Sequence, residues 1–256
     1  MKSIEEGREF LRATAWEDTS GLESDQSRSI PHPPQQKPIP EGADLVGLPS
    51  PDGASVVRSD IARVMGARRS RREFLDRPVS LEQLSFLLWA TQGMKRLVGG
   101  GAASLRTVPS AGARHPFETY LHVRAVEGLD PPGVYRYLPV EHCLYLVREG
   151  DRGPELTRGC LGQSFAGTCP VCFIWSAVPY RTEWRYSVLS PKIIAIDSGH
   201  VCQNLYLAAE ALGLGTCAIA AYHQTLMDRL VGLDGRDEFV IYVAPAGWPV
   251  RREGDE

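Results

Sequence analysis

The chain of 256 residues lacks the features that would assign it to a membrane, to secretion or to a nucleic acid. No apolar run approaches 20 residues, so the sequence predicts no transmembrane helix. Residues Met1–Glu6 show no apolar core of a signal peptide, and we therefore expect the protein in the cytoplasm. The formal net charge is −3, so no overall positive field favours binding of a nucleic acid.

Cysteine occurs six times, but not in the spacing of a structural metal site. Cys169 and Cys172 form one C-x-x-C pair, and a zinc site would need a second ligand pair at similar spacing, which the sequence lacks. The segment around Cys172 is apolar and reads as a strand, in which residues three apart point to opposite faces. We therefore predict reduced, mostly buried cysteines and no metal, with a metal or redox role for the pair as the alternative.

Glycine is not arranged as a dinucleotide-binding fingerprint. No predicted strand precedes Gly99–Gly101, and the G-x-G-x-x-G spacing is absent. A second group of small residues, Pro109, Ser110, Ala111 and Gly112, is more informative. It predicts a turn that lets the backbone approach a flat ligand closely and aim N–H groups at ligand heteroatoms. A plain turn before a strand is the alternative.

Arginine is concentrated in one stretch, Arg68-Arg69-Ser70-Arg71-Arg72. Guanidinium groups bind a phosphate through paired hydrogen bonds without a metal ion, so these side chains are candidate phosphate ligands. Such a stretch can also be a solvated face or a nucleic-acid patch. Taken with the turn of small residues, it favours a mononucleotide cofactor whose phosphate lies on the arginines and whose ring lies against the turn.

The chain is predicted to divide at about residue 55. Residues 1–55 form an N-terminal extension, with a short helix between Ser3 and Trp16 and a proline-rich leader from Ile30 to Pro40 that we expect to be extended and docked on a surface. Residues 56–256 form one domain, in which helices and strands alternate irregularly, so the predicted class is α+β. Helices are expected at Val57–Met65, Leu81–Leu88, Pro191–Leu212 (capped by Ser190) and Leu226–Leu230, and strands at Thr119–Val126, Gly133–Tyr137, Cys143–Val147, Val171–Val178, Cys217–Ala220 and Phe239–Ala244.

Four stretches in this order resemble the FMN-dependent nitroreductase superfamily and, within it, the SagB-type dehydrogenase branch. They are Arg68–Phe74, Arg106–Pro116, Asp197–Leu205 and Ala211–Ile219, and the resemblance covers roughly Val56–Gly247. Each stretch alone is weak, but the four together at these intervals are specific. The resemblance implies a nitroreductase-like fold, with a mainly antiparallel central sheet wrapped by helices, and an interlocked homodimer.

The resemblance also implies the cofactor and its contacts. FMN would lie at the dimer interface, and a hydride from NAD(P)H or from an organic substrate would be passed onward. One subunit would give Arg68, Ser70 and Arg72 to the phosphate and ribityl chain, and the other would give the turn Pro109–Gly112 to the ring. The remaining implied contacts are Ala218, Ile219, Ala220 and Ala221 facing flavin N5, Gln163 at the pyrimidine edge, and Arg251 or Arg252 over the phosphate.

The sequence departs from the family at the substrate side. Azoline-oxidising members of the branch carry a Lys-Tyr pair before the central helix, and the aligned pair here is Arg185-Tyr186. Arginine stays protonated at any working pH, so Arg185 cannot be a general base, although it can hold an anionic substrate or orient Tyr186. Tyr186 is the candidate proton donor. Leu189 and Pro191 stand where many members have arginine and tyrosine, which implies a different cleft wall and a different substrate.

Three functions are compatible with these residues. The preferred hypothesis is an FMN oxidoreductase that passes electrons to a small organic acceptor, because reduced flavin carries negative charge that placed donors stabilise. A tailoring dehydrogenase of a peptide or another biosynthetic intermediate is the first alternative, and a flavin-binding module without turnover is the second. Tyr180 and Trp184 either line the substrate cleft or pack the dimer interface.

Overall fold

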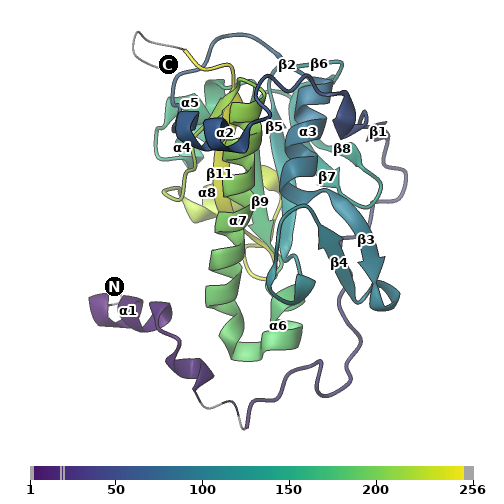
Figure 1. The fold of residues 1–256 in the computed structure, drawn as a ribbon, viewed down its shortest axis with the longest axis vertical. Coiled ribbons are helices and arrows are strands. Elements are labelled where there is room, and N and C mark those ends of the chain that lie inside the picture. The colour runs from purple at the N-terminus through teal and green to yellow at the C-terminus, as the bar shows by residue number, and fades with distance from the viewer. Residues whose placement is uncertain (1–2, 18, 20, 251–256) are drawn as a thin grey trace.

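The computed structural model describes residues 3–17, 19 and 21–250 (Figure 1). A seven-stranded sheet in the order β1-β8-β7-β5-β9-β11-β10 runs through the centre, and each neighbouring pair is antiparallel. The expected α+β class with a mainly antiparallel sheet is confirmed. The strands are β1 (Leu45–Gly47), β5 (Phe117–Val123), β7 (Gly133–Leu138), β8 (Cys143–Glu149), β9 (Val171–Ala177), β10 (Gly215–Thr216) and β11 (Phe239–Gly247).

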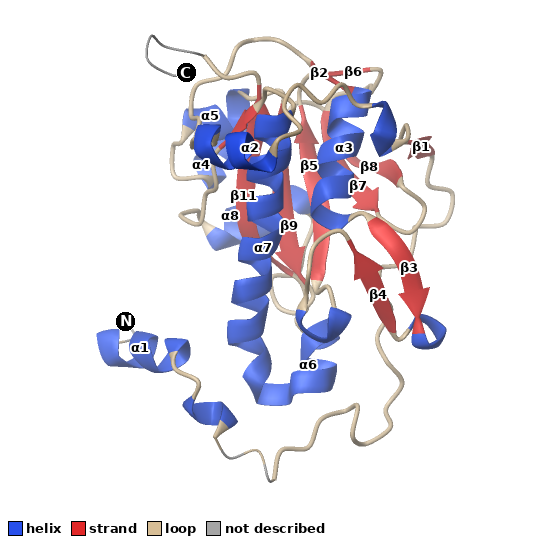
Figure 2. Ribbon diagram, in the orientation of Figure 1, coloured by secondary structure: helices blue, strands red, loops and turns tan. Residues whose placement is uncertain are grey.

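Helices cover both faces of the sheet (Figure 2). Because side chains alternate along a strand, Phe173 and Trp175 of β9 join the buried cluster under α3 (Leu81–Gln92) and α7 (Ser190–Ala211). Cys172 and Ile174 join the cluster on the opposite face. That cluster lies under α4 (Gly153–Gly159), α5 (Ser164–Thr168) and α8 (Gln224–Val231). None of the described helices is long and apolar enough to cross a membrane.

The C-x-x-C pair belongs to the core. Cys169 lies just before β9 and Cys172 within it, and both side chains are buried. All six cysteines are free thiols. Burial raises the pKa of the Cys172 thiol well above its ordinary value, so this group stays protonated. The interpretation as a buried strand is therefore confirmed for Cys172.

Three expected elements differ from the structure in their bounds or caps. The first helix, α2 (Ile61–Ala67), begins later than Val57 because the Asp60 carboxylate accepts from the N–H groups of the first turn. Ser190 is not the cap of α7, since a short 3-10 turn runs directly into that helix. The strand expected at Cys217–Ala220 is reduced to β10 and one bridge between Ile219 and Val243.

Several short elements carried too little local signal to be predicted. The glycines at 99–101 lie at the tip of a hairpin whose strands, β3 (Met94–Val98) and β4 (Ala103–Arg106), pair antiparallel. Helix α6 (Tyr180–Tyr186) precedes α7, and the two-residue strands β2 (Val79–Ser80) and β6 (Val126–Glu127) pair in parallel at the edge of the fold. The short helix expected between Ser3 and Trp16 is present as α1 (Ile4–Leu11).

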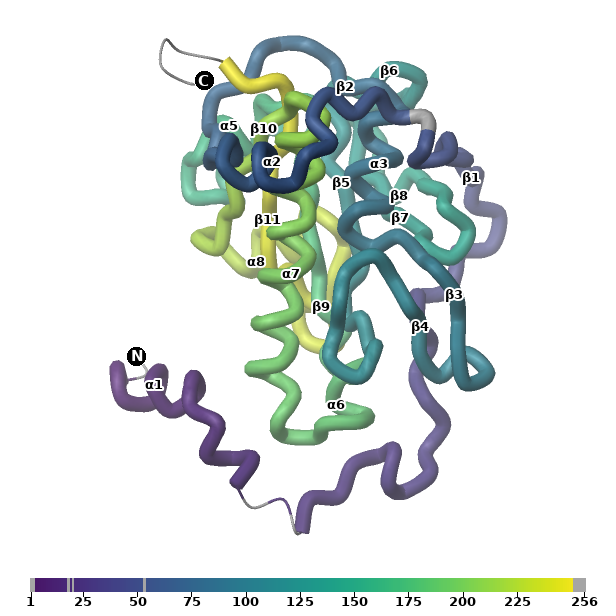
Figure 3. Tube along the Cα trace, viewed as in Figure 1, coloured from purple at the N-terminus to yellow at the C-terminus, as the bar shows by residue number. Residues whose placement is uncertain are grey.

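The proline-rich leader lies along the body of the protein, while α1 projects from it (Figure 3). Proline has no N–H, and the leader instead offers carbonyl groups to donors from the core. Its carbonyl oxygens accept hydrogen bonds from Trp184 Nε1 (2.9 Å), Arg181 Nε (3.0 Å) and a terminal nitrogen of each of Arg106 (2.8 Å) and Arg136 (2.7 Å). The leader is therefore held by buried side chains. The accepting carbonyls are those of Ile30, Pro34, Gln35 and Lys37.

Candidate flavin site

The arginine stretch lies beside the end of α7 and the start of β10. Ser70 forms a parallel bridge with Thr216, and the Arg71 N–H donates to the Thr216 carbonyl at 2.9 Å. A Cβ at Gly215 would come within 2.7 Å of Arg71 Cγ, so glycine is needed for this close approach. The Thr216 hydroxyl is buried, without a hydrogen-bond partner in the described part of the chain. The region around Arg68–Arg72 and Thr216, called the arginine half-site below, therefore keeps a hydroxyl group that no described residue binds.

Tyr206 of α7 organises the same region, and its role was not foreseen. Its hydroxyl lies 3.1 Å from the Ser70 hydroxyl and accepts from the Ala218 N–H at 2.8 Å. The Arg68 guanidinium lies over its ring, 5.3 Å from the centroid. The tyrosine thus joins the arginine stretch to the segment expected to face the flavin.

The segment Ala218–Ala221 is only partly free to bind a ligand. The Ala218 N–H donates to Tyr206, and the Ile219 N–H donates to the Val243 carbonyl at 2.7 Å. The remaining candidates are the N–H groups of the exposed Ala220 and Ala221. Gln163 lies beside this segment, since its amide nitrogen donates to the Cys160 carbonyl at 3.0 Å and to the Ala221 carbonyl at 3.3 Å.

The turn Pro109–Gly112 is fixed by Asp197 of α7. The Ser110 hydroxyl donates to its carboxylate at 2.6 Å, and the Ala111 N–H lies 3.2 Å from the same oxygen. The expectation that this turn aims free N–H groups at a ligand therefore fails at Ala111, because a carboxylate already accepts that N–H. Burial raises the pKa of Asp197, against the hydrogen bonds that stabilise its charge.

The candidate catalytic pair lies directly on this turn. A Cβ at Gly112 would come within 2.8 Å of the Tyr186 hydroxyl and 2.9 Å of Arg185 Cδ. Gly112 has a φ of +58°, a conformation that side chains disfavour. Only glycine leaves room for both side chains here. The structure thus brings the turn Pro109–Gly112 and the Arg185-Tyr186 pair together, and we call this group the turn half-site.

The two half-sites lie on different sides of α7. Asp197 holds the turn and Tyr206 holds the arginine stretch, and nine residues separate them along the helix. At 3.6 residues per turn, nine residues correspond to about 13 Å of axial rise and to roughly opposite directions around the axis. One chain therefore assembles the arginine half-site and the turn half-site separately. It does not bring the two half-sites together.

The remaining predicted residues contact other parts of the protein or lie outside the described residues. Arg251 and Arg252 lie outside the described residues; the chain before them runs beside the arginine stretch, with the Val250 N–H donating to Glu73. The Tyr180 hydroxyl donates to Asp25 of the N-terminal extension, and Trp184 donates to the Ile30 carbonyl at the start of the leader. Burial lowers the pKa of His115 to about 3, so this imidazole is neutral beside the turn.

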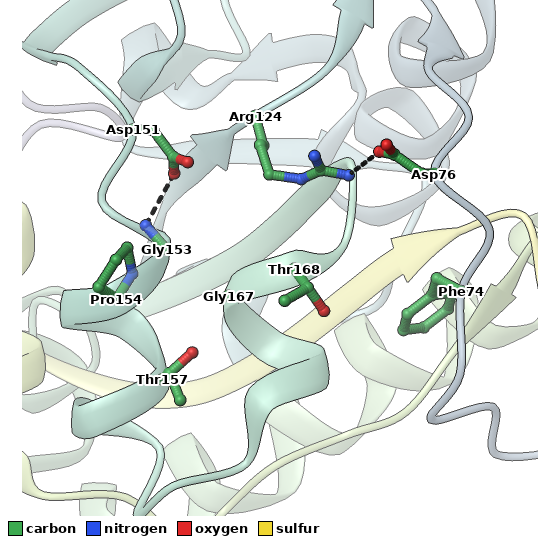
Figure 4. Close-up of a pocket in the computed structure, with 9 residues that line it drawn as sticks. All are labelled: Phe74, Asp76, Arg124, Asp151, Gly153, Pro154, Thr157, Gly167 and Thr168. Atoms are coloured by element: carbon green, nitrogen blue, oxygen red, sulfur yellow. Dashed lines mark hydrogen bonds and ion pairs between the residues drawn. The ribbon is translucent and has the colours of Figure 1, made fainter.

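A separate open pocket of about 430 Å³ lies away from both half-sites. Figure 4 shows its lining, which includes Phe74, Arg124 and Thr168. Arg124 is already paired with Asp76 at 2.8 Å, and the Gly153 N–H already donates to a carboxylate. None of the predicted site residues lines this pocket, so we do not assign the cofactor to it.

Comparison with known proteins shows the family of the chain. The sequence model of the Nitroreductase family matches residues 65–248. A provisionally named nitroreductase of Methanocaldococcus jannaschii is 33% identical over 204 residues, which cover 80% of this chain and 97% of that protein. A crystal structure of a provisionally named nitroreductase from Ralstonia eutropha matches with a TM-score of 0.66 and 30% identity, over 87% of this chain and 100% of that one.

A further relative comes from a biosynthetic operon. The trifolitoxin operon protein TfxC of Rhizobium leguminosarum bv. trifolii is 25% identical over 232 residues, which cover 86% of this chain and 64% of that protein. The family model and the relative from Methanocaldococcus jannaschii together show that the chain belongs to the nitroreductase family of oxidoreductases.

Proposed function

We propose that the protein is an FMN-dependent oxidoreductase that works as a homodimer. Each site would combine the arginine half-site of one copy with the half-site of the turn and Arg185-Tyr186 from the other. The observation that carries the proposal is the arrangement on α7, where Asp197 and Tyr206 hold the two half-sites on roughly opposite sides of one helix. A single copy cannot enclose a ligand between them, whereas a second copy can supply the missing half.

The arginine half-site fits the phosphate of FMN. Arg69 and Arg72 are exposed and make no ion pair with the described residues, and Arg68 is oriented by the Tyr206 ring. Several guanidinium groups can neutralise a phosphate dianion without a metal ion. When bound, FMN supplies the hydride acceptor and donor, while the protein supplies binding and electrostatics.

The exposed face of α7 supports the second copy. Ile196 is 51% exposed, and nothing lies within 4 Å of where a Cβ of Gly199 would be. Ala195 and Gln203 lie on the same side of the helix and are also exposed. A stripe of small and apolar residues on a helix permits close packing of another helix.

The side chains on the turn have separable roles in the reaction. Tyr186 places its hydroxyl over Gly112, where it can hold or deliver a proton at the ring side of the turn. Arg185 is a permanent cation and orients an anionic group without moving a proton. The N–H groups of Ala220 and Ala221 offer fixed donors on the arginine half-site.

The test is a titration of the purified protein with FMN, combined with light scattering after size exclusion. We expect saturable binding, absorption bands at about 370 and 450 nm as for any bound flavin, and a molecular mass equal to that of two chains. A monomer that binds FMN tightly would contradict the shared site, and a protein that binds none would contradict the cofactor.

A second candidate function differs in the source of the hydride. The relative from the trifolitoxin operon favours a tailoring dehydrogenase, in which an organic donor and not a nicotinamide reduces the flavin. Anaerobic mixing of the FMN-loaded protein with NADH and with NADPH separates the two. Rapid bleaching of the flavin band supports the nicotinamide-dependent oxidoreductase, and its absence supports the tailoring enzyme.

A further inference from the structure

Arg185 lies beside Gly112 in the turn half-site and makes no ion pair with the described residues. Its side chain is exposed, and its contact within the described chain is with the Tyr186 ring, 5.6 Å from the guanidinium to the centroid. Arg114 lies close enough that Arg185 contributes, after burial, to lowering the pKa of Arg114. The half-site therefore has an excess of positive charge.

The acids near Arg185 do not compensate this charge. Asp197 accepts hydrogen bonds from the turn, and Glu183 stands two residues before Arg185 on α6, a spacing at which helical side chains do not face each other. The nearby cation Lys192 donates to carbonyl groups of the N-terminal segment. An anionic group from a ligand is the partner that the described residues leave open for Arg185.

An aromatic wall stands next to this cation. The ring of Trp16 lies 6.0 Å from the Tyr186 ring, centroid to centroid, at an interplanar angle of 60°. Trp16 is 44% exposed, so part of its surface stays open beside Tyr186. The Lys192 ammonium group holds the segment that precedes Trp16, because it donates to the Arg12 carbonyl at 3.1 Å. A crevice of about 380 Å³ lies between this segment and the start of α7; Trp16 lines it, whereas Arg185 and Tyr186 do not.

We propose, resting on the function proposed above, that the substrate is a planar aromatic or heteroaromatic anion. Its anionic group pairs with Arg185, and its ring packs against Trp16 and Tyr186. A carboxylate receives two parallel N–H bonds from a guanidinium, whereas a neutral amide has one acceptor oxygen and carries no opposite charge. Aromatic rings contribute beyond their buried area when they stack or meet edge to face. Trp16 is thereby a specificity-determining residue supplied by the N-terminal segment.

The first experiment measures binding of unreactive probes to the FMN-loaded dimer by calorimetry. Benzoate, the isosteric benzamide and acetate separate the charge from the ring. We expect benzoate to bind about 10-fold or more tightly than either of the other two. Arg185→Gln should remove the preference for benzoate over benzamide, and the matched control Arg236→Gln, at a side chain that is 91% exposed, should keep it. Equal binding of benzoate and benzamide to the native dimer would overturn the proposal.

The second experiment tests the aromatic wall. Trp16→Ala should weaken benzoate binding about 5-fold while acetate binding is unchanged, and Trp16→Phe should restore most of the loss. Unchanged benzoate binding in Trp16→Ala would remove Trp16 from the site. If Trp16→Ala weakened the binding of acetate and benzoate equally, the proposed contact between Trp16 and the benzoate ring would also be contradicted, because acetate has no ring.

A kinetic comparison links binding to turnover. With 4-nitrobenzoate and 4-nitrobenzamide as acceptors, Arg185→Gln should raise KM for the acid about 10-fold more than KM for the amide. The binding measurements need no turnover, so the two proposals fail in different ways. A dimer that binds FMN but does not prefer benzoate contradicts only the substrate class, whereas a protein that binds no FMN contradicts the proposed function.

Discussion

Asp197 holds the turn at Ser110 across 87 residues of sequence, through a hydrogen bond of 2.6 Å from the serine hydroxyl to the carboxylate. The Ala111 N–H reaches the same carboxylate at 3.2 Å, and the His115 N–H donates to the Ser110 oxygen at 2.9 Å. This chain of bonds fixes a turn that small residues alone would leave mobile. The carboxylate acts on the site through the turn, so Asp197 is a positioning residue.

Replacement of Asp197 by alanine should lower the free energy of unfolding by about 2–4 kcal/mol. The Ser110 hydroxyl and the Ala111 N–H lose a charged acceptor, and hydrogen bonds to charged groups are among the stronger ones. Urea unfolding measures the loss. Asp76→Ala is the matched control, since Asp76 is 87% exposed in its pair with Arg124 and should cost less than about 1 kcal/mol. A similar loss in both variants would contradict the role of Asp197.

Gly112→Ala should displace the candidate catalytic pair. The added methyl would meet the Tyr186 hydroxyl at 2.8 Å and Arg185 Cδ at 2.9 Å, on a backbone with a φ of +58°. Gly42→Ala separates the two effects, because Gly42 has a φ of +74° but nothing within 4 Å of the Cβ position. Both variants should lose about 1 kcal/mol of stability to backbone strain, and only Gly112→Ala should also slow oxidation of the reduced flavin. Equal rates in the two variants would show that the contact does not matter.

Much of the fold could be predicted because its signals are local. Helix α3 carries a capping box, in which the Ser80 hydroxyl accepts from the Gln83 N–H and the Gln83 side chain accepts from the Ser80 N–H. Helix α7 has Pro191 in its first turn and Gly213 just beyond its end. By contrast, α6 is held by the leader, with Trp184 donating to a carbonyl 154 residues earlier. A contact at that separation leaves no pattern in the local sequence.

The candidate site also contains residues that the sequence could indicate and residues that it could not. The arginine stretch, the turn and the Ala218–Ala221 segment could each be found because small residues and guanidinium groups have direct uses in cofactor binding. The residues that organise them could not. Asp197 and Tyr206 act on partners 87 and 136 residues away, and their roles follow from where α7 places them. The use of the Ala111 N–H by Asp197 could be seen only in the structure.

Arg181→Met should test how far the leader is part of the fold. The Arg181 side chain is buried, its Nε donates to the Pro34 carbonyl at 3.0 Å, and its other end pairs with the buried Glu118. Glu118 also pairs with the buried Arg136, so Arg181→Met leaves this carboxylate with one of its two cations and leaves the Pro34 carbonyl without its donor. We therefore expect a loss of about 1–3 kcal/mol in urea unfolding. Arg236→Met, at an exposed side chain, should change stability by less than about 0.5 kcal/mol. An equally small loss in Arg181→Met would show that this contact with the leader adds little to stability.

His115 should make the protein less stable in acid. Burial lowers its pKa to about 3 in the folded state, whereas the unfolded chain has an ordinary pKa of about 6.5. Between these values the unfolded state binds one more proton, so stability falls as the pH falls, by about 1.4 kcal/mol per pH unit for this group. His115→Gln should remove that part of the slope between pH 6.5 and 5 in urea unfolding. Above pH 7.5 the two proteins should differ by a constant amount, and identical slopes below pH 6.5 would contradict the assignment.

Arg72→Ala should weaken FMN binding about 10-fold or more, because a guanidinium contact with a phosphate is charge-assisted. Fluorescence titration of the variant with FMN measures the change, and the loss should shrink as salt is added, since screening weakens exposed charges. Arg96→Ala is the matched control, as Arg96 is also exposed but lies on the β3–β4 hairpin and not in the arginine stretch. Riboflavin, which lacks the phosphate, should bind both variants and the native protein alike. If Arg72→Ala weakened riboflavin and FMN equally, the arginine would contact the ring or support the fold, and the phosphate assignment would be wrong.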